Sequence, residues 1–188
     1  DVETLSRGTA FWRCFTHWIG GMGVLVFIMA VMPLSDSSSM HLMRAESPGP
    51  AVGKLVPKVK TTAMILYGIY VVFTVIEIIA LLIAGMPLFD SMTLTFGTVG
   101  TGGFGLLNSS IASYSTAVQI IITVFMIICS INFTVYYMFL IKRPKEALMC
   151  EEMRYYLLIV FGSALLIAFN IRASFASFGK AFQQAIFQ

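Results

Sequence analysis

Four long apolar segments alternate with more polar segments along the 188 residues of this chain. They cover approximately residues 14–34, 62–85, 117–141 and 155–171, and the last is the shortest. A helix that crosses a bilayer needs roughly 20 apolar residues, within a range of about 17–25. Each segment meets that requirement, so the pattern predicts an all-α membrane protein with four transmembrane helices in a lipid bilayer.

Composition supports this fold class and narrows the function. Hydrophobic residues make up 58% of the chain and charged residues 11%, against about 25% charged residues in an average soluble domain. The net charge of +3 is modest, so no nucleic-acid partner is expected. Two histidines and three widely spaced cysteines offer no metal or catalytic pattern, so neither an enzyme nor a cofactor is predicted. With Asp at position 1 and no signal peptide recognised, the chain is interpreted as part of a longer protein.

The basic residues predict which way the apolar segments face, because lysine and arginine gather in cytoplasmic loops. Four lie between the first and second segments, four lie between the third and fourth, and none lies in residues 86–116. Residues 35–60 and 142–154 are therefore predicted to be cytoplasmic loops. Residues 86–116 are predicted to enter from the outer side.

This outer region has the pattern of a pore loop. Pro87 suits a first helical turn, and residues 88–98 predict a helix of about 11 residues, roughly 16 Å long. The run Thr98-Val99-Gly100-Thr101-Gly102-Gly103-Phe104-Gly105 follows, and polar residues 108–116 return to the surface. A half-length helix and a glycine-rich return between two spans form the span–pore helix–filter–span repeat of potassium-channel-like proteins.

The glycines indicate what this loop does. Unpaired peptide groups in hydrocarbon cost several kcal/mol each and are tolerated where they line a cavity. Glycine frees the backbone to turn carbonyls towards a dehydrated cation. The same letters match the dinucleotide fingerprint G-x-G-x-x-G, which requires a preceding strand and an acidic residue about 20 positions on. Because no Asp or Glu occurs between Asp90 and Glu146, a nucleotide loop is not expected.

Three further features have two interpretations each. A helical face formed after the fourth segment predicts a partial second pore helix, with an interfacial amphipathic helix as the alternative; its residues are Phe175, Phe178, Phe182 and Ile186. Glu77 lies within a predicted span, either as a functional ionisable group or as a carboxylic acid bonded to a neighbouring helix. Asn132 either lines the cavity below the filter or bonds across helices.

Several motifs in this chain match those of one known family in the same order. They are Phe11-Trp12-Arg13 with His17-Trp18-Ile19-Gly20-Gly21-Met22-Gly23, residues 40–50, Phe89-Asp90 with residues 97–104, and Cys129-Ser130-Ile131-Asn132-Phe133. They resemble the end of the first repeat, the first cytoplasmic loop, the second pore helix with its filter, and the last helix of the second repeat. The family is that of TrkH-type potassium uptake proteins, in the Trk/Ktr/HKT superfamily.

This resemblance implies four linked span–pore–span repeats around one pore. The chain would hold the last helix of repeat 1, a cytoplasmic loop, the whole of repeat 2, a second cytoplasmic loop and the start of repeat 3: residues 1–34, 35–60, 61–141, 142–154 and 155–188. The implied partners are the remaining repeats, a second copy in a homodimer and a cytosolic nucleotide-binding regulatory subunit. The implied location is the bacterial plasma membrane.

The resemblance also implies that K⁺ is the transported ion. The predicted ligands are the backbone carbonyls of Thr101, Gly102, Gly103 and Phe104, with the Thr101 hydroxyl as an additional ligand. The predicted supports are Gly100, Gly105 and Asp90, and Asp90 would cap the pore helix as an anion at its N-terminus. The family usually has serine after the aromatic residue, where this chain has Gly105.

Two other architectures explain part of the pattern. A homotetrameric cation channel subunit would carry one filter per chain, but it leaves the first and fourth segments unexplained. A secondary carrier with a broken helix would place intramembrane charges beside the break, and the glycine-rich loop has none nearby.

Overall fold

The computed structural model describes residues 1–23, 59–175 and 177–187, and all regular structure within them is helical. The elements are α1 (Arg7–Gly21), α4 (Val59–Ile83), α5 (Leu88–Val99), α6 (Thr116–Cys129), α7 (Phe133–Leu140), α8 (Pro144–Leu148), α9 (Glu151–Ile171), the 3₁₀ turn η1 (Arg172–Ser174) and α10 (Phe178–Phe187). The all-α prediction is confirmed for these residues. The predicted loop over residues 35–60 and the end of the first predicted span lie outside them, apart from the start of α4.

Two helices in the described part of the chain have the length and composition to cross a membrane. They are the 21-residue stretches Ala63–Ile83 of α4 and Glu151–Ile171 of α9. Helices α6 and α7 pass the same test only as a pair, and they are bent by 83° at the break between them. The second and fourth predicted spans therefore correspond to helices that could cross a membrane, the third is broken, and the first lies partly outside the described residues.

The break corrects the position predicted for Asn132. Helix α6 ends at Cys129, and Asn132 caps α7 by accepting a hydrogen bond from the Thr134 N–H at 2.9 Å. Such a cap satisfies a backbone donor that the new helix leaves free. The Asn132 side-chain amide donates to Glu152 Oε2 of α9 at 3.1 Å. Asn132 therefore lies between two helices, rather than inside one, and bonds to a third.

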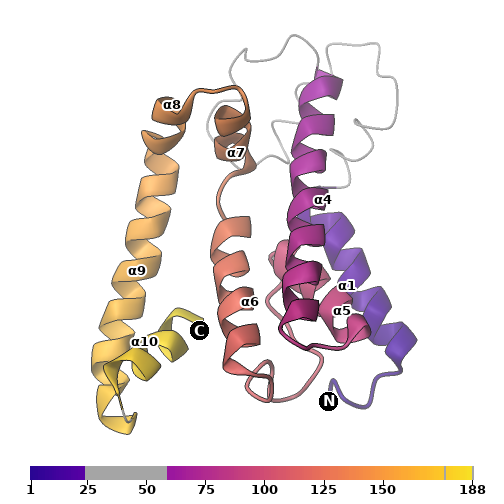
Figure 1. Cartoon of the computed structure of the whole chain (residues 1–188), viewed down its shortest axis with the longest axis vertical. Coiled ribbons are helices and arrows are strands. Elements are labelled where there is room, and N and C mark those ends of the chain that lie inside the picture. The colour runs from indigo at the N-terminus through magenta and orange to yellow at the C-terminus, as the bar shows by residue number, and fades with distance from the viewer. Residues whose placement is uncertain (24–58, 176, 188) are drawn as a thin grey trace.

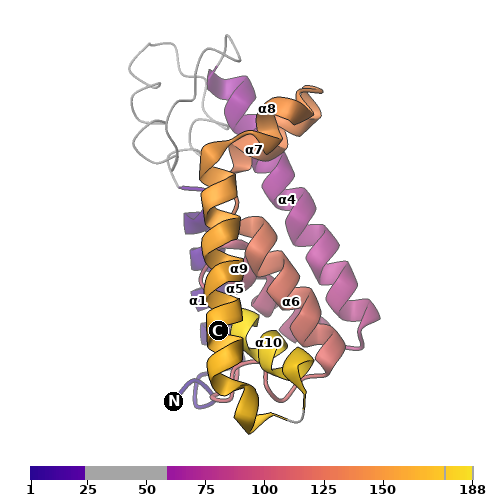
Figure 2. The same ribbon diagram turned by 90° about the vertical axis from the view of Figure 1, so that its left-hand side faces the viewer.

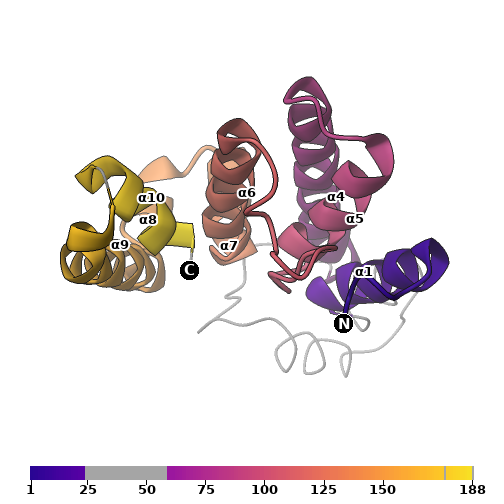
Figure 3. The ribbon, with the colours of Figure 1, turned by 90° about the horizontal axis from the view of Figure 1, so that it is seen from below.

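The helices form an elongated arrangement, with the short helices α5 and α10 in one half of it (Figure 1). Helices α4, α6 and α9 run along the long axis, and α7 and α8 lie at the end opposite to the α5 and α10 region (Figure 2). Viewed from below, α5 lies between α1 and α4 (Figure 3), and it packs against both of them and against α6.

Helix α5 is the central element of the packing. Eight of its twelve residues are buried, which is unusual for so short a helix and places it inside the bundle. Val99 joins a cluster with Met22, which follows the end of α1, with Tyr70 of α4 and with Cys129 of α6. Leu94 joins a second cluster with Leu81, Met86, Ile111, Val118 and Ile122. The residues at its C-terminus are therefore held from several sides.

The C-terminal helix is observed where the sequence predicts one, and its most buried residues are two alanines beside the predicted apolar face. Ala181 and Ala185 of α10 are buried, and the helix packs against α9 and α6. Phe175 and Phe178, which begin the predicted apolar face, remain 37% and 44% exposed. Small side chains let α10 approach its neighbours closely. Phenylalanines add to the contact, because the Phe178 ring lies 5.2 Å from the Phe169 ring of α9 and Phe187 packs against the cluster that contains Val118 and Ile122 of α6.

Candidate functional site

The glycine-rich loop (residues 100–105) begins where α5 ends. The Gly100 N–H donates to the Phe96 carbonyl at 3.2 Å, and the Thr101 N–H donates to the Thr98 carbonyl at 2.9 Å. The next two N–H groups, of Gly102 and Gly103, both donate to the Gly97 carbonyl, at 2.8 and 3.2 Å. These bonds satisfy the last turn of α5 and fold the loop back onto it.

These bonds also fix the direction of the first loop carbonyls. In a trans peptide the C=O points opposite to the N–H of the following residue, and no described peptide bond is cis. Because the N–H groups of Gly102 and Gly103 point at α5, the carbonyls of Thr101 and Gly102 point away from it. Two successive carbonyls turned to the same side are what a backbone cation site requires.

Two loop residues adopt left-handed backbone conformations. Thr101 has φ 60° and Gly103 has φ +68°. A β-branched residue in this region is uncommon and costs on the order of 1–3 kcal/mol. A Cβ on Gly103 would meet only Met126 Cε, at 3.9 Å, so the backbone angle rather than lack of space requires glycine there.

The carbonyls in the outer half of the loop face two different helices. The Phe104 carbonyl oxygen would lie 3.2 Å from a Cβ on Gly97, so this carbonyl packs against α5 instead of continuing the row begun by Thr101 and Gly102. The Gly105 carbonyl accepts a hydrogen bond from Arg13 Nη2 of α1 at 2.8 Å. The two outer carbonyls therefore contact different elements, since the Phe104 carbonyl lies against α5 and the Gly105 carbonyl bonds to α1.

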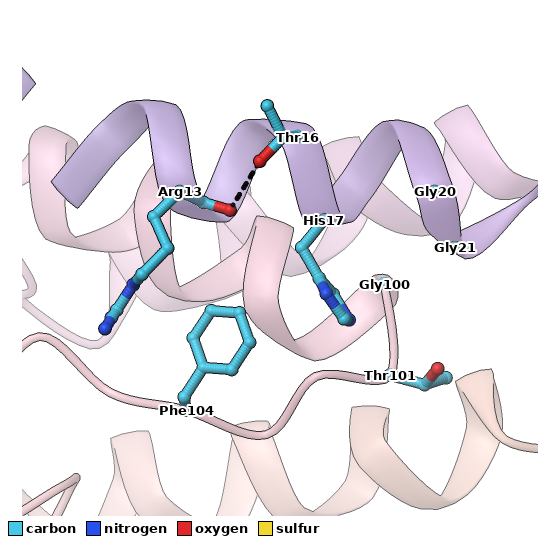
Figure 4. Close-up of a pocket in the computed structure, with 8 residues that line it drawn as sticks. All are labelled: Arg13, Thr16, His17, Gly20, Gly21, Gly100, Thr101 and Phe104. Atoms are coloured by element: carbon cyan, nitrogen blue, oxygen red, sulfur yellow. Dashed lines mark hydrogen bonds between the residues drawn. The ribbon is translucent and has the colours of Figure 1, made fainter. Parts of the chain in front are cut away.

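Helix α1 covers the loop with two side chains that the sequence analysis did not assign to the site. The Phe104 ring lies between Arg13 and His17 (Figure 4). The Arg13 guanidinium carbon is 4.7 Å from the ring centroid, and the His17 ring meets Phe104 edge-on at 5.1 Å. Arg13 and His17 are four residues apart and share one helix face, which was the available signal.

Two glycines of the loop permit this close cover. A Cβ on Gly102 would lie 2.7 Å from His17 Nε2 and from Phe104 Cε1, and a Cβ on Gly100 would lie 2.9 Å from His17 Cδ2. A larger residue at either position would force the His17 ring or the neighbouring backbone to shift. The supporting role predicted for Gly100 has a steric reason, because a side chain at this position would collide with His17.

A hollow of about 640 Å³ lies beside the loop, between it and α1. It is lined by Arg13, Thr16, His17, Gly20, Gly21, Gly100, Thr101 and Phe104 (Figure 4). Arg13 Nε and His17 Nε2 are buried and have no hydrogen-bond partner among the described residues. The hollow therefore combines small residues with polar atoms next to the Thr101 backbone.

Asp90 holds the start of α5 in a way that differs from the predicted cap. Pro87 takes the N-cap position, and α5 has no side-chain cap bond. Asp90 lies in the first turn, where its charge still complements the helix dipole, and its Oδ2 accepts a hydrogen bond from the Tyr114 hydroxyl at 3.1 Å. Burial, with the Asp90 carboxylate adding to it, raises the pKa of Tyr114 to about 12.

Glu77 of α4 lies beside α5, the helix that leads into the loop. Its side chain is fully buried, and neither carboxyl oxygen has a hydrogen-bond partner among the described residues. The hydroxyl group of Thr98 in α5 lies near the Glu77 carboxyl group. This hydroxyl donates its hydrogen bond to the Leu94 carbonyl, at 2.9 Å. Glu77 is therefore a neighbour of α5, and none of its described contacts indicates that it binds an ion.

The described residues thus combine membrane-length helices with a buried half-length helix and a loop whose first carbonyls turn away from that helix. The model of the TrkH family, described as "Cation transport protein", matches residues 1–171. The chain belongs to the TrkH family, which is a family of transporters and not of enzymes.

Individual relatives agree with this assignment. The chain is 33% identical over 195 residues to the Trk system potassium uptake protein TrkH of Vibrio parahaemolyticus, covering 100% of this chain and 40% of that protein. It is 35% identical over 147 residues to TrkH of Escherichia coli K12, covering 77% and 30%. The E. coli protein TrkG is 32% identical over 174 residues, covering 91% and 36%.

A solved structure shows the same fold. The crystal structure of the potassium transporter TrkH from V. parahaemolyticus superposes with a TM-score of 0.77 at 28% identity, covering 99% of this chain and 38% of that one. The chain therefore spans less than half the length of these relatives. The family resemblance found in the sequence motifs is confirmed.

Proposed function

We propose that this chain contributes one ion-coordinating repeat to a potassium uptake transporter of the bacterial plasma membrane. The carbonyls of Thr101, Gly102 and Gly103 replace water around a dehydrated K⁺ ion. One observation carries the proposal: the N–H groups of Gly102 and Gly103 are bonded to Gly97, so the two preceding carbonyls turn away from α5. The names of the similar proteins, which are potassium uptake proteins, support the choice of ion.

Helix α5 assists ion binding through its orientation. Its C-terminal end leads directly into the loop, and a helix carries a partial negative charge of roughly half an elementary charge at that end. This charge attracts a cation at the Thr101 and Gly102 carbonyls. The Phe104 carbonyl takes no part, and Phe104 acts through its ring, which α1 holds.

The proposed repeat architecture follows the family. Residues 61–141 form repeat 2, residues 1–34 end repeat 1, and residues 155–188 begin repeat 3 with α10 as a partial second pore helix. Figures 1 and 2 support this, because α10 lies in the same half of the molecule as α5, away from α7 and α8. Residues 35–60 and 142–154 are cytoplasmic loops in this proposal. The remaining repeats, a second copy in a homodimer and a cytosolic nucleotide-binding subunit complete the assembly.

The test is Gly103→Ser in the complete transporter. A side chain at φ +68° adds strain, and roughly 1–2 kcal/mol of such strain is enough to turn the neighbouring carbonyls. We expect the preference for K⁺ over Na⁺ uptake to fall by about tenfold, the factor that 1.4 kcal/mol represents.

The matched control is Gly162→Ser in α9, where a Cβ meets no described atom within 4 Å. This variant should keep the wild-type K⁺ preference. Unaltered discrimination between the two ions in Gly103→Ser, at normal membrane levels, would overturn the proposed function.

A further inference from the structure

Arg13 makes two contacts with the outer end of the glycine-rich loop. Its Nη2 donates to the Gly105 carbonyl at 2.8 Å, and its guanidinium lies 4.7 Å above the centre of the Phe104 ring. The two loop residues are consecutive, while Arg13 lies 92 residues before Gly105 in the chain. One side chain of α1 thus holds both the backbone and the ring at this point.

The geometry points to Arg13 as a positioning residue that sets the outer limit of the ion-binding carbonyl row and, with it, ion selectivity. This inference rests on the proposed function and names a residue that acts on the ion through the loop. Arg13 touches no ion itself; it decides which carbonyls remain available.

The Gly105 carbonyl is not free to bind a cation. Its oxygen already accepts a bond from a guanidinium, and bonds to charged donors are short and strong. A K⁺ ion placed at the same oxygen would face a positive charge at close range, where the repulsion is large because a partly buried site screens it weakly. Gly105 therefore lies outside the row, and the row ends at Gly103.

The contacts of the Phe104 ring restrict the orientation of the Gly103 carbonyl. Phe104 follows Gly103 directly, and its ring is held between Arg13 on one side and His17 on the other (Figure 4). A cation over an aromatic face is attracted by the ring quadrupole. Gly103 has an open surrounding and a permissive backbone, so the clamp on Phe104 is what limits rotation of the peptide that carries the Gly103 carbonyl.

The experiment compares Arg13→Met with Arg7→Met in the complete transporter, with K⁺ and Na⁺ uptake measured separately. Arg7 is the matched control, because it lies on the same helix and stacks on Phe89 at 5.5 Å, at the start of α5 and away from the loop. Both changes remove one positive charge from α1. We expect Arg13→Met to lower the K⁺ preference by about tenfold, as expected for the loss of a hydrogen bond to a charged group, while Arg7→Met keeps it.

Arg13→Lys is the second variant, and it guards against misfolding of Arg13→Met. Lysine keeps the charge and a donor for Gly105 but lacks the planar group, so it should recover most of the K⁺ preference. Selectivity that falls equally in the Arg7 and Arg13 variants would show a general charge effect and overturn the inference. So would a wild-type preference in Arg13→Met, or a preference in Arg13→Lys that is lost as fully as in Arg13→Met.

The Gly103→Ser variant, assayed in parallel, separates the two proposals. If Gly103→Ser loses K⁺ preference and Arg13→Met does not, the inference about Arg13 fails and the proposed function stands. If neither variant changes selectivity, the proposed function itself fails.

Discussion

Single residues decide how closely α1 approaches the loop, and two adjacent glycines illustrate this. A Cβ on Gly21 would lie 2.6 Å from the Tyr70 hydroxyl and 2.7 Å from Gly100 Cα. A Cβ on the preceding Gly20 would meet no described atom within 4 Å. The Tyr70 hydroxyl also donates to the Trp18 carbonyl at 2.8 Å, so this contact fixes α1 on α4.

We therefore predict opposite effects for two alanine substitutions. Gly21→Ala should destabilise the transporter by about 1–3 kcal/mol, as overpacking does, and should lower its melting temperature in detergent. Gly20→Ala should be neutral or slightly stabilising, because alanine is the better helix former by about 1 kcal/mol. Equal melting temperatures for the two variants would contradict the close contact at Gly21.

At the scale of single residues, the sequence predicted that the carbonyls of Thr101 and Gly102 turn to one side and that position 103 requires the backbone freedom of glycine. It did not predict that the Phe104 carbonyl packs against Gly97, because that direction depends on hydrogen bonds made by the folded loop. Nor did it assign Arg13, because its spacing from His17 indicates a shared helix face but not that this face meets a loop 92 residues further along the chain.

At the scale of elements, a tyrosine after the loop secures the start of α5. The Tyr114 hydroxyl donates to Asp90 in the first turn of the helix, joining the returning loop to the half-length helix. Asn108 forms a second tie, since its side chain and backbone bond to Asp1, Val2 and Glu3 ahead of α1. The segment that follows the glycine-rich loop is thus held in place by Asn108 and Tyr114, while the start of the loop is held by its bonds to α5.

We predict that Tyr114→Phe lowers stability by about 1 kcal/mol near neutral pH, because Asp90 loses a donor. The raised pKa of Tyr114, about 12 against an ordinary 10, means that the folded protein favours the neutral phenol. Its contribution is therefore complete below pH 10 and is lost as the pH rises through 12. Melting temperatures of the two proteins should converge over that window, and a constant difference between pH 8 and 12 would contradict the assignment.

Element lengths were the most predictable feature. The apolar run over 62–85 and the short run over 88–98 correspond to α4 and α5 within a few residues, since hydrophobic length limits helix ends. The division of the third run into α6 and α7 was not predicted, because its residues remain mostly apolar. Asn132 was the available signal, as a residue type that favours helix N-termini.

At the scale of the whole molecule, the described residues leave a large apolar surface exposed, above all on α9. Only 11% of the spanning window of α9 is buried, and large apolar side chains such as Leu158 and Leu166 are 68% and 74% exposed. Apolar surface of this extent is stable against lipid or against other protein. The chain covers 40% of the length of the V. parahaemolyticus relative.

The central claim concerns where K⁺ binds in the complete transporter. The most direct measurement is a structure determined with Rb⁺ or Tl⁺, which replace K⁺ and scatter X-rays anomalously. The account predicts an ion at direct coordination distance from the Thr101 and Gly102 carbonyl oxygens, with none at the Gly105 carbonyl beside Arg13. An ion row that bypasses Thr101 and Gly102, or that includes Gly105, would contradict it.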